Sequence, residues 1–463
     1  MQQPNEVVNN TKQFGLSYIL NRGHSRSVKA KKNIFALVII KGLSVLTSLI
    51  FVPITINYLS PASYGMWLTI YGIVGWFGLL DIGLGNGLRN KMAECIANND
   101  KASAKVYLST AYAILIIIMT IAGAVFYVVN HFLNWSDIIN VPKEKSTELS
   151  RVALIVFGFF CMQLVIKLIN SVLLASHKAA FVSAINLVCS IFSLIIVYVL
   201  TKSTTGGSLV YLAFTIGIVN VTVPLVLSVW LFKNYYKDYS PSLNFVSFKH
   251  AKSLMNVGAM FFLFQSTALI VVATDNVIIT QLFGPAEVTP YNVALKYFTP
   301  VTIIFNIFSA PLWSAYTEAY TLTDFVWIKK TTKKMLYFWM LIFFGIIPMV
   351  LLSNYVYKIW IGDQIHVAFG VTVFMALFTL LSAFNQIFGN FINGIGKLRL
   401  AFYLTLITAI INIPLCIIFA KYLKLGSAGI ILASCVSLLP DLIFIPIQYW
   451  KIVNKKAKGI WNK

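Results

Sequence analysis

Long apolar runs alternate with short polar segments along almost the whole chain. An α-helix needs about 20 residues to cross roughly 30 Å of hydrocarbon, and most of these runs reach that length. They cover approximately residues 34–58, 64–88, 106–132, 151–176, 180–201, 208–232, 252–283, 288–317, 334–352, 367–394, 399–420 and 426–450. The pattern therefore predicts an all-α polytopic membrane protein with twelve transmembrane helices.

Composition supports this interpretation. Of the 463 residues, 59% are apolar and only 11% are charged, whereas about 25% of the residues in a typical soluble domain are charged. The segment that precedes the first apolar run is polar and basic, so we expect no signal peptide. The five cysteines are scattered and form no Cys-x-x-Cys motif, so we expect neither a disulfide nor a metal site.

Positive charge is distributed unequally between the two sides of the predicted topology. If the N-terminus is cytoplasmic, 26 of the 36 Lys and Arg residues lie in the two tails and the cytoplasmic loops. Seven lie in outer segments, and three lie within spans. This asymmetry follows the positive-inside rule, so we expect both termini in the cytoplasm. Basic cytoplasmic loops that face anionic lipid headgroups account for the net charge of +22. We therefore expect no nucleic acid partner.

Short matching segments indicate an internal duplication. The stretches "YLSPASYGMW" from Tyr58 and "LFGPAEVTPYNVA" from Leu282 both place a Pro-Ala turn between two spans. A lysine in a minimal turn and a glycine-rich span opening each recur at nearly the same offset. The equivalent residues are Pro61 and Pro285, Lys178 and Lys397, and Gly207 and Gly426. Because six spans separate the partners, we expect two six-helix lobes related by a pseudo-two-fold axis along the membrane normal.

The duplication divides the chain into five parts. These are a basic cytoplasmic segment (1–33), an N-lobe with spans 1–6 (34–232), a cytoplasmic linker (233–250), a C-lobe with spans 7–12 (251–450) and a basic cytoplasmic tail (451–463).

One glycine-rich stretch, "GLLDIGLGNGLRNKMAE" from Gly78 to Glu94, resembles a nucleotide-binding loop only superficially. It follows a membrane span rather than a strand, and its glycines match neither the P-loop nor the dinucleotide-binding pattern. Gly83 and Gly87 instead have the spacing that lets helices pack closely. The segments between spans are short, which leaves no room for a soluble catalytic domain. We therefore expect no enzymatic activity, no catalytic residues and no metal.

Together with "TPVTIIFNIFSAPLWSAYTEAYTLTDFVWIKK" (299–330) and "NGIGKLRLAF" (393–402), this stretch resembles a known family. It is similar to the polysaccharide-type flippases, including Wzx-type O-antigen translocases, of the multidrug/oligosaccharidyl-lipid/polysaccharide exporter superfamily. The likeness extends over roughly residues 33–450 and includes the duplicated twelve-span plan. The peptidoglycan lipid flippases of that superfamily usually carry more spans and an arginine-rich first lobe, and this chain departs from both features.

Three lysines fall inside the hydrocarbon region. Lys41, Lys167 and Lys296 lie about 11–15 Å from the nearest interface, which is farther than a lysine side chain reaches. Buried cations without a matching acid cluster favour an anionic cargo, although each lysine could instead neutralise helix carbonyls or an acid. The resemblance implies that such residues recognise the pyrophosphate of an undecaprenyl-pyrophosphate-linked oligosaccharide.

Three aspartates are candidates for ion coupling or salt bridges. Asp275 lies at a depth similar to Lys296 on the adjacent span, so we expect a salt bridge between them or, alternatively, a site for a coupling H⁺ or Na⁺. Asp81 and Asp441 lie in the inner halves of spans 2 and 12, where each is either an ion site or a satisfied polar residue near a helix end.

Polar and proline residues within spans complete the candidate site. The amides are expected either to line a hydrated sugar-passing cavity or to form hydrogen bonds between helices; they are Gln265, Asn306, Asn385 and Asn390. Pro300 and Pro311 bracket a segment of span 8 and are expected to act as a hinge, or else as static kinks.

These features predict a flippase of the bacterial cytoplasmic (inner) membrane. It would translocate undecaprenyl-pyrophosphate-linked oligosaccharide by alternating access for surface polysaccharide biosynthesis. We expect it to act as a monomer among membrane lipids, with other polysaccharide-assembly proteins as further partners, and without a cofactor other than a coupling H⁺ or Na⁺. The alternatives are a cation-coupled exporter of drugs or metabolites and an integral-membrane polysaccharide polymerase or ligase; short, sparsely charged outer loops argue against the latter.

Overall fold

The computed structural model describes residues 25–463 except Ile82, His177, Thr205, residues 252–273, Ala310 and Lys463. The described residues form helices, turns and loops without a strand. Ten of the helical segments are long and apolar enough to cross a membrane. Residues 274–283 form the described end of predicted span 7, and span 8 begins as a 22-residue helix. The all-α polytopic fold class is confirmed.

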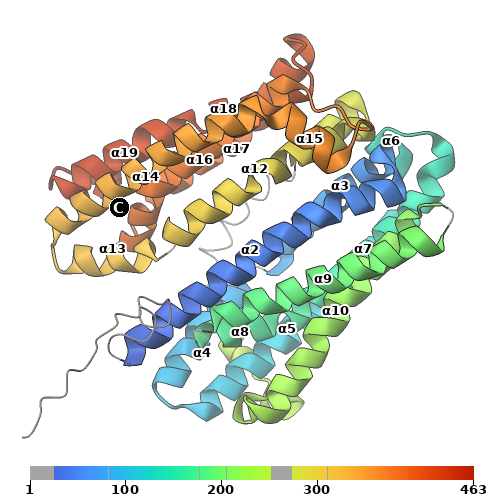
Figure 1. Ribbon diagram of the computed structural model, residues 1–463. Coiled ribbons are helices and arrows are strands. Elements are labelled where there is room, and N and C mark those ends of the chain that lie inside the picture. Colours follow the sequence, from blue (N-terminus) through green and yellow to red (C-terminus); the bar gives the residue numbers. More distant parts are fainter. Residues whose placement is uncertain are drawn as a thin grey trace, which may run out of the picture.

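The N-terminal half forms one group of helices, coloured blue to green in Figure 1. Its helices are α2 (Ser25–Leu59), α3 (Pro61–Trp76), α4 (Leu84–Ala97), α5 (Lys101–Phe132), α6 (Trp135–Ile139), α7 (Ser146–Ile166), α8 (Leu168–Ala175), α9 (Ala179–Ser203) and α10 (Leu209–Asn234).

The C-terminal half forms a second group, coloured yellow to red in Figure 1. Its helices are α12 (Val288–Ser309), α13 (Leu312–Thr321), α14 (Phe325–Leu351), α15 (Ser353–Ile361), α16 (Phe369–Ile395), α17 (Arg399–Ile417), α18 (Ser427–Ser437) and α19 (Leu439–Val453). Figure 1 shows the two groups side by side, with α2 and α3 of one facing α12 of the other.

Several predicted spans are interrupted. The predicted ends of spans 2 and 8 are wrong, whereas spans 4 and 12 each remain one candidate membrane span, Lys143–Ala175 and Ser427–Val453. Span 2 ends in a 3₁₀ turn at Asp81, and α4 then starts after Gly83, whose φ of 70° suits glycine. Span 8 breaks at Pro311, which cannot donate to the helix that precedes it. Spans 4 and 12 break at Lys167 and Leu438. The breaks in spans 2 and 8 make α4 and α13 separate helices, and these lie at the same end of the two lobes.

The linker lies along α5. Lys101 Nζ is 2.7 Å from an oxygen of Asp238, and this hydrogen bond holds the pKa of the Asp238 carboxyl below its ordinary value. The backbone N–H groups of Ser242 and Ser247 donate to hydroxyls of α5 at 3.0 Å. The connection is therefore fixed to the N-lobe by specific contacts.

The two Pro-Ala turns have the same conformation. Ser60 has φ 85° and ψ 155°, and Gly284, at the equivalent place in the second turn, has φ 87° and ψ 165°. A serine rarely adopts this region, which glycine enters freely. The shared backbone geometry at equivalent positions supports the duplication that the sequence predicts.

These turns bring the lobes together at one end, which we call the closed end. Thr289 Oγ1 donates to the Pro61 carbonyl at 2.7 Å, and the hydroxyls of Thr69 and Thr280 are 2.7 Å apart. A Cβ atom added to Gly65 would lie only 1.7 Å from the Pro285 oxygen. Residues four positions after each proline therefore lie against the opposite proline carbonyl.

The opposite end, which we call the basic end, carries α4, the start of α14 and the C-terminal tail. Within the part of the chain that the structure describes, no hydrogen bond joins the lobes there. Among the described residues, hydrogen bonds therefore join the lobes at the closed end and not at the basic end.

Replacing Gly65 by alanine should destabilise closure, because its methyl group cannot fit against the Pro285 carbonyl. We expect spin labels at Ala62 and Ala286 to report longer distances in Gly65→Ala than in the parent protein. Gly123→Ala is the control, because a Cβ there meets nothing within 4 Å. Unchanged distances in folded, monodisperse Gly65→Ala would contradict the role of this contact in holding the closed end together.

Candidate functional site: a cavity between the lobes

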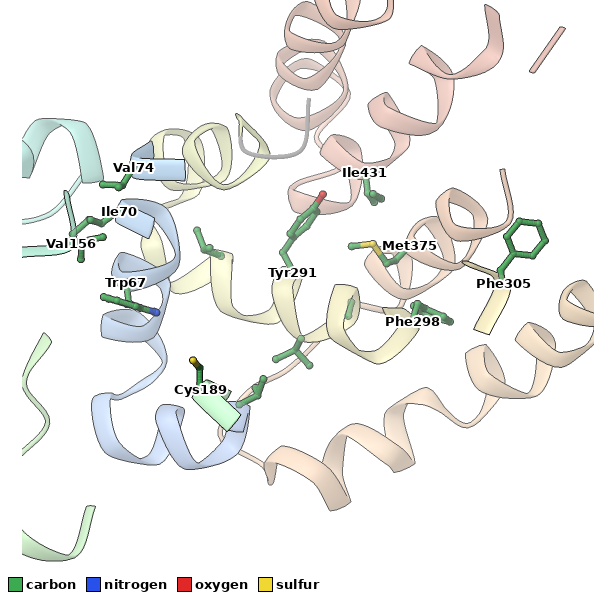
Figure 2. Packing of buried hydrophobic residues seen from close by; sticks show 14 of the residues in the cluster. Trp67, Ile70, Val74, Val156, Cys189, Tyr291, Phe298, Phe305, Met375 and Ile431 are labelled. Carbon is green, nitrogen blue, oxygen red and sulfur yellow. The ribbon is translucent and has the colours of Figure 1, made fainter. Parts of the chain in front are cut away.

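A cavity of about 620 Å³ lies between the two lobes. The N-lobe lines it with α2, α3, α9 and α10, and the C-lobe with residues 274–283, α12, α16 and α18. Such a position between two lobes and this volume are typical of a ligand site. Figure 2 shows Trp67 on α3 and Tyr291 on α12, which come from opposite lobes and both line the cavity.

Lys296 is the cation of this cavity. It lies on α12, and its Nζ donates to Ser48 Oγ of α2 at 3.3 Å, so the bond crosses between the lobes. No carboxylate forms an ion pair with Lys296 among the described residues. Pro300, one turn later, has no N–H to donate to the Lys296 carbonyl, which loosens the helix at this point. The cavity therefore holds a lysine that forms no ion pair with a described acid, although Asp275 lines the same cavity.

Asp275 does not pair with Lys296, so the expected salt bridge is wrong for this conformation. The Tyr291 hydroxyl donates to Asp275 Oδ2 at 2.7 Å, which occupies the carboxylate within the C-lobe. Its Oδ1 is buried and has no partner among the described residues. Beside it, Asn292 Nδ2 donates to Asn276 Oδ1 at 2.8 Å. The prediction of the pair used only the depth of the two residues in the membrane. Whether they meet also depends on how each helix is rotated about its own axis.

Lys41 and Lys167 lie nearer the basic end and do not line this cavity. Lys41 is half-buried on α2, seven residues before Ser48, which places it about 10 Å away on the same helix face. Lys167 is exposed at the break between α7 and α8, and its Nζ lies 3.3 Å from Gln163 Oε1. Neither forms an ion pair with a described acid. The three lysines thus lie at different depths rather than in one cluster.

The other two aspartates lie outside the cavity. Asp81 Oδ1 accepts from the Gly85 N–H at 3.2 Å, so this side chain satisfies the start of α4. Asp441 is buried in the first turn of α19 and accepts from the Thr408 hydroxyl at 3.2 Å. Their local bonds correspond to the satisfied polar residues that we considered as an alternative, and an ion-coupling role stays a prediction.

The predicted amides mostly connect helices of the C-lobe. Gln386 donates to Asn306, and Asn390 donates to the Ser309 carbonyl at 3.2 Å, so both link α12 to α16. Asn385 Oδ1 is buried without a partner among the described residues. None of these three asparagines lines the cavity, and Gln265 lies outside the described residues.

Sequence reasoning missed most of the N-lobe wall of the cavity. Residues that line it include Tyr64, Trp67, Tyr71, Ser193 and Asn220. The aromatic residues at positions 64, 67 and 71 have helical spacing, which was the available signal. Spacing alone did not reveal that this face of α3 meets a cavity rather than a neighbouring helix.

Comparison with known proteins identifies the fold. Residues 257–418 match the MatE family model. The chain has the fold of MOP-superfamily transporters. It is 17% identical to a multidrug resistance MATE transporter of that superfamily in an inward-facing conformation, with a TM-score of 0.73 over 92% of this chain and 100% of the other. The lipid II flippase MurJ gives a TM-score of 0.67 at 14% identity, over 90% of this chain and 91% of MurJ.

Sequence relatives have names that concern O-antigen. A proposed O-antigen transporter of Salmonella typhi is 22% identical over 58% of this chain and 61% of its own length. A proposed O-antigen export protein of Yersinia pseudotuberculosis is 22% identical over 75% of this chain and 79% of its length. The match therefore spans about three fifths of the Salmonella relative. The resemblance inferred from the sequence is confirmed.

The position of Asn306 predicts a structural role. Asn306→Ala should lower the free energy of unfolding by about 0.6–1.7 kcal/mol, the range for a hydrogen bond between membrane helices, and should leave ligand binding unchanged. Denaturant titration in detergent measures the first effect, with the exposed Asn234→Ala as control. A binding defect without a loss of stability would contradict the structural role and would indicate that Asn306 contacts the cargo.

Proposed function

We propose that this MOP-superfamily protein is a flippase that translocates undecaprenyl-pyrophosphate-linked oligosaccharide across the bacterial inner membrane. The single observation that carries the proposal is the unpaired Lys296 ammonium in a cavity between two lobes. A pyrophosphate brings at least two negative charges to such a site, and a buried ammonium without an acid partner is otherwise costly. The names of the O-antigen relatives and of MurJ support a lipid-linked oligosaccharide as the cargo class.

The direction of access follows from the charge distribution. Most Lys and Arg residues belong to the tails and loops that the predicted topology assigns to the cytoplasm. The positive-inside rule therefore favours a cytoplasmic location for the basic end, which carries α4, the start of α14 and the C-terminal tail. The lobes are separated there and joined at the opposite end, which makes this the inward-facing state. The headgroup then enters from the cytoplasmic leaflet, the lipid tail stays in the bilayer, and rocking of the lobes exposes the headgroup outside. Lys41 lies along this route on the same face of α2.

Ion coupling would use the buried acids. Asp275 is the strongest candidate for H⁺ or Na⁺ because its Oδ1 lies at the cavity without a partner among the described residues. Proton or sodium binding there would alter its bond with Tyr291 on α12, the helix that also carries Lys296. Pro300 and Pro311 are the proposed hinge positions around this site.

A cation-coupled exporter of drugs or metabolites is the second candidate, favoured by the MatE match and by the MATE neighbours. Such a protein would bind an organic cation at a carboxylate. In this chain the carboxylate that lines the cavity already accepts from Tyr291, and a lysine lies on the same helix as that tyrosine. The electrostatics therefore favour an anionic cargo.

Lys296→Ala should weaken binding of undecaprenyl pyrophosphate about ten- to a hundredfold, the range for losing a hydrogen bond to a charged group. Lys296→Arg should retain part of the affinity, because it keeps the charge. Purified variants in nanodiscs provide the binding measurement, and proteoliposome assays provide translocation. Lys421→Ala, which removes an exposed cation far from the cavity lining, is the control.

The triple variant Lys41→Ala, Lys167→Ala and Lys296→Ala should abolish translocation. Transport at the parental rate in that variant would exclude the cationic-cavity mechanism. Tight, Lys296-independent binding of an organic cation would favour the exporter instead.

A further inference from the structure

The two walls of the cavity differ in charge. Among the described residues, the C-lobe wall carries Lys296 and Asp275, whereas the N-lobe wall carries no charged side chain. The N-lobe wall instead presents aromatic rings from α3 and hydroxyl and amide groups from α9 and α10. A cargo held across the cavity therefore meets a charged face on one side and a neutral face on the other.

Aromatic rings form the centre of the neutral wall. Trp67 and Tyr71 have ring centroids 5.5 Å apart with an interplanar angle of 36°, so they form two adjoining tilted surfaces. Tyr71 is 48% exposed although it lies within a membrane span. A half-exposed tyrosine that lines a cavity offers its ring to a ligand rather than to neighbouring helices.

Space continues past these rings into the N-lobe. A Cβ atom added to Gly75, one turn after Tyr71, would meet nothing within 4 Å. A second hollow of about 210 Å³ between α3, α7 and α10 shares Trp67, Tyr71, Gly75 and Ile216 with the main cavity. The two rings therefore lie where the cavities join, with room on both sides.

Neutral hydrogen-bonding groups accompany the rings. Ser193 Oγ is buried and has no partner within the described part of the chain. Asn220 Nδ2 donates to the Ile216 carbonyl at 2.9 Å, and no described residue bonds to its Oδ1. A purely hydrocarbon occupant would leave these groups unsatisfied, which costs free energy.

Sugars match this combination. A pyranose ring has an apolar C–H face that packs on aromatic rings, and its edges carry hydroxyls that both donate and accept hydrogen bonds. We propose that the N-lobe wall is a saccharide subsite, in which Tyr71 and Trp67 pack against a sugar ring and Ser193 and Asn220 bind its hydroxyls. This inference rests on the proposed function, because it places the sugar beside the pyrophosphate held by Lys296.

Two lipids separate the subsites experimentally. Undecaprenyl pyrophosphate without sugar tests the charged wall, and the same lipid carrying a disaccharide tests both walls. Tyr71→Ala should weaken binding of the glycosylated lipid about three- to tenfold, the value for an aromatic packing contact, and leave the sugar-free lipid unchanged. Tyr71→Phe, which keeps the ring, should retain most of the affinity. Lys296→Ala should weaken binding of both lipids.

The matched control is Tyr211→Ala. Tyr211 is 58% exposed on α10 and lines neither cavity, so its loss should change neither affinity. Equal weakening of both lipids by Tyr71→Ala, or no effect on either, in protein that remains monodisperse would overturn the saccharide subsite. Failure of the proposed function would look different, because the parent protein would then bind neither lipid.

Discussion

The contact between the two Pro-Ala turns is the constraint on which the rest of the structure depends. The Thr289 hydroxyl donates to the Pro61 carbonyl, and Gly65 lies against the Pro285 carbonyl without space for a side chain. The lobes approach this closely at one end, and their described residues make no hydrogen bond across the other. The central cavity lies between these lobes, and its walls are surfaces of both.

Lys296 shows how this geometry leaves a charge available. Its contact across the cavity is a serine hydroxyl, which satisfies one donor, and no described acid forms an ion pair with it. The acid that could neutralise it, Asp275, is held by Tyr291 on the same helix as the lysine. Pro300 further weakens the backbone next to the lysine. A positive charge thus lies at the cavity beside a backbone position where α12 lacks one hydrogen bond.

The helical segments and the lobe duplication were predictable because both depend on regularities along the chain. Apolar length sets each span, and the repeated Pro-Ala turn fixes the offset between the lobes. The break at Lys167 was not predictable, because no glycine or proline stands there, whereas the break at Leu438 precedes Pro440 in the first turn of α19. Pro311, expected as a hinge or a static kink, lies between two helices, α12 and α13, and its hinge role stays a prediction.

The candidate site was predictable only in part, for a related reason. The depth of Lys296 in its span follows from counting residues, whereas its partner depends on helix rotation, and the expected bond to Asp275 was therefore wrong. Predicting the N-lobe wall of the cavity also required the rotation of a helix, in this case α3. Tyr64, Trp67 and Tyr71 have the spacing of an ordinary packing face, and only their position opposite α12 makes them part of a cavity.

The charged wall and the neutral wall of the cavity belong to different lobes, and this has a consequence for transport. A ligand that binds only one wall moves with that lobe and has no preference between lobe arrangements. A ligand that contacts both walls has an affinity that depends on the distance between them, and it therefore shifts the equilibrium between arrangements. A glycosylated lipid pyrophosphate, with its phosphates on Lys296 and its sugar on the neutral wall, meets that condition. Coupling between cargo binding and rocking then requires only that the sugar and the charge be recognised by different lobes.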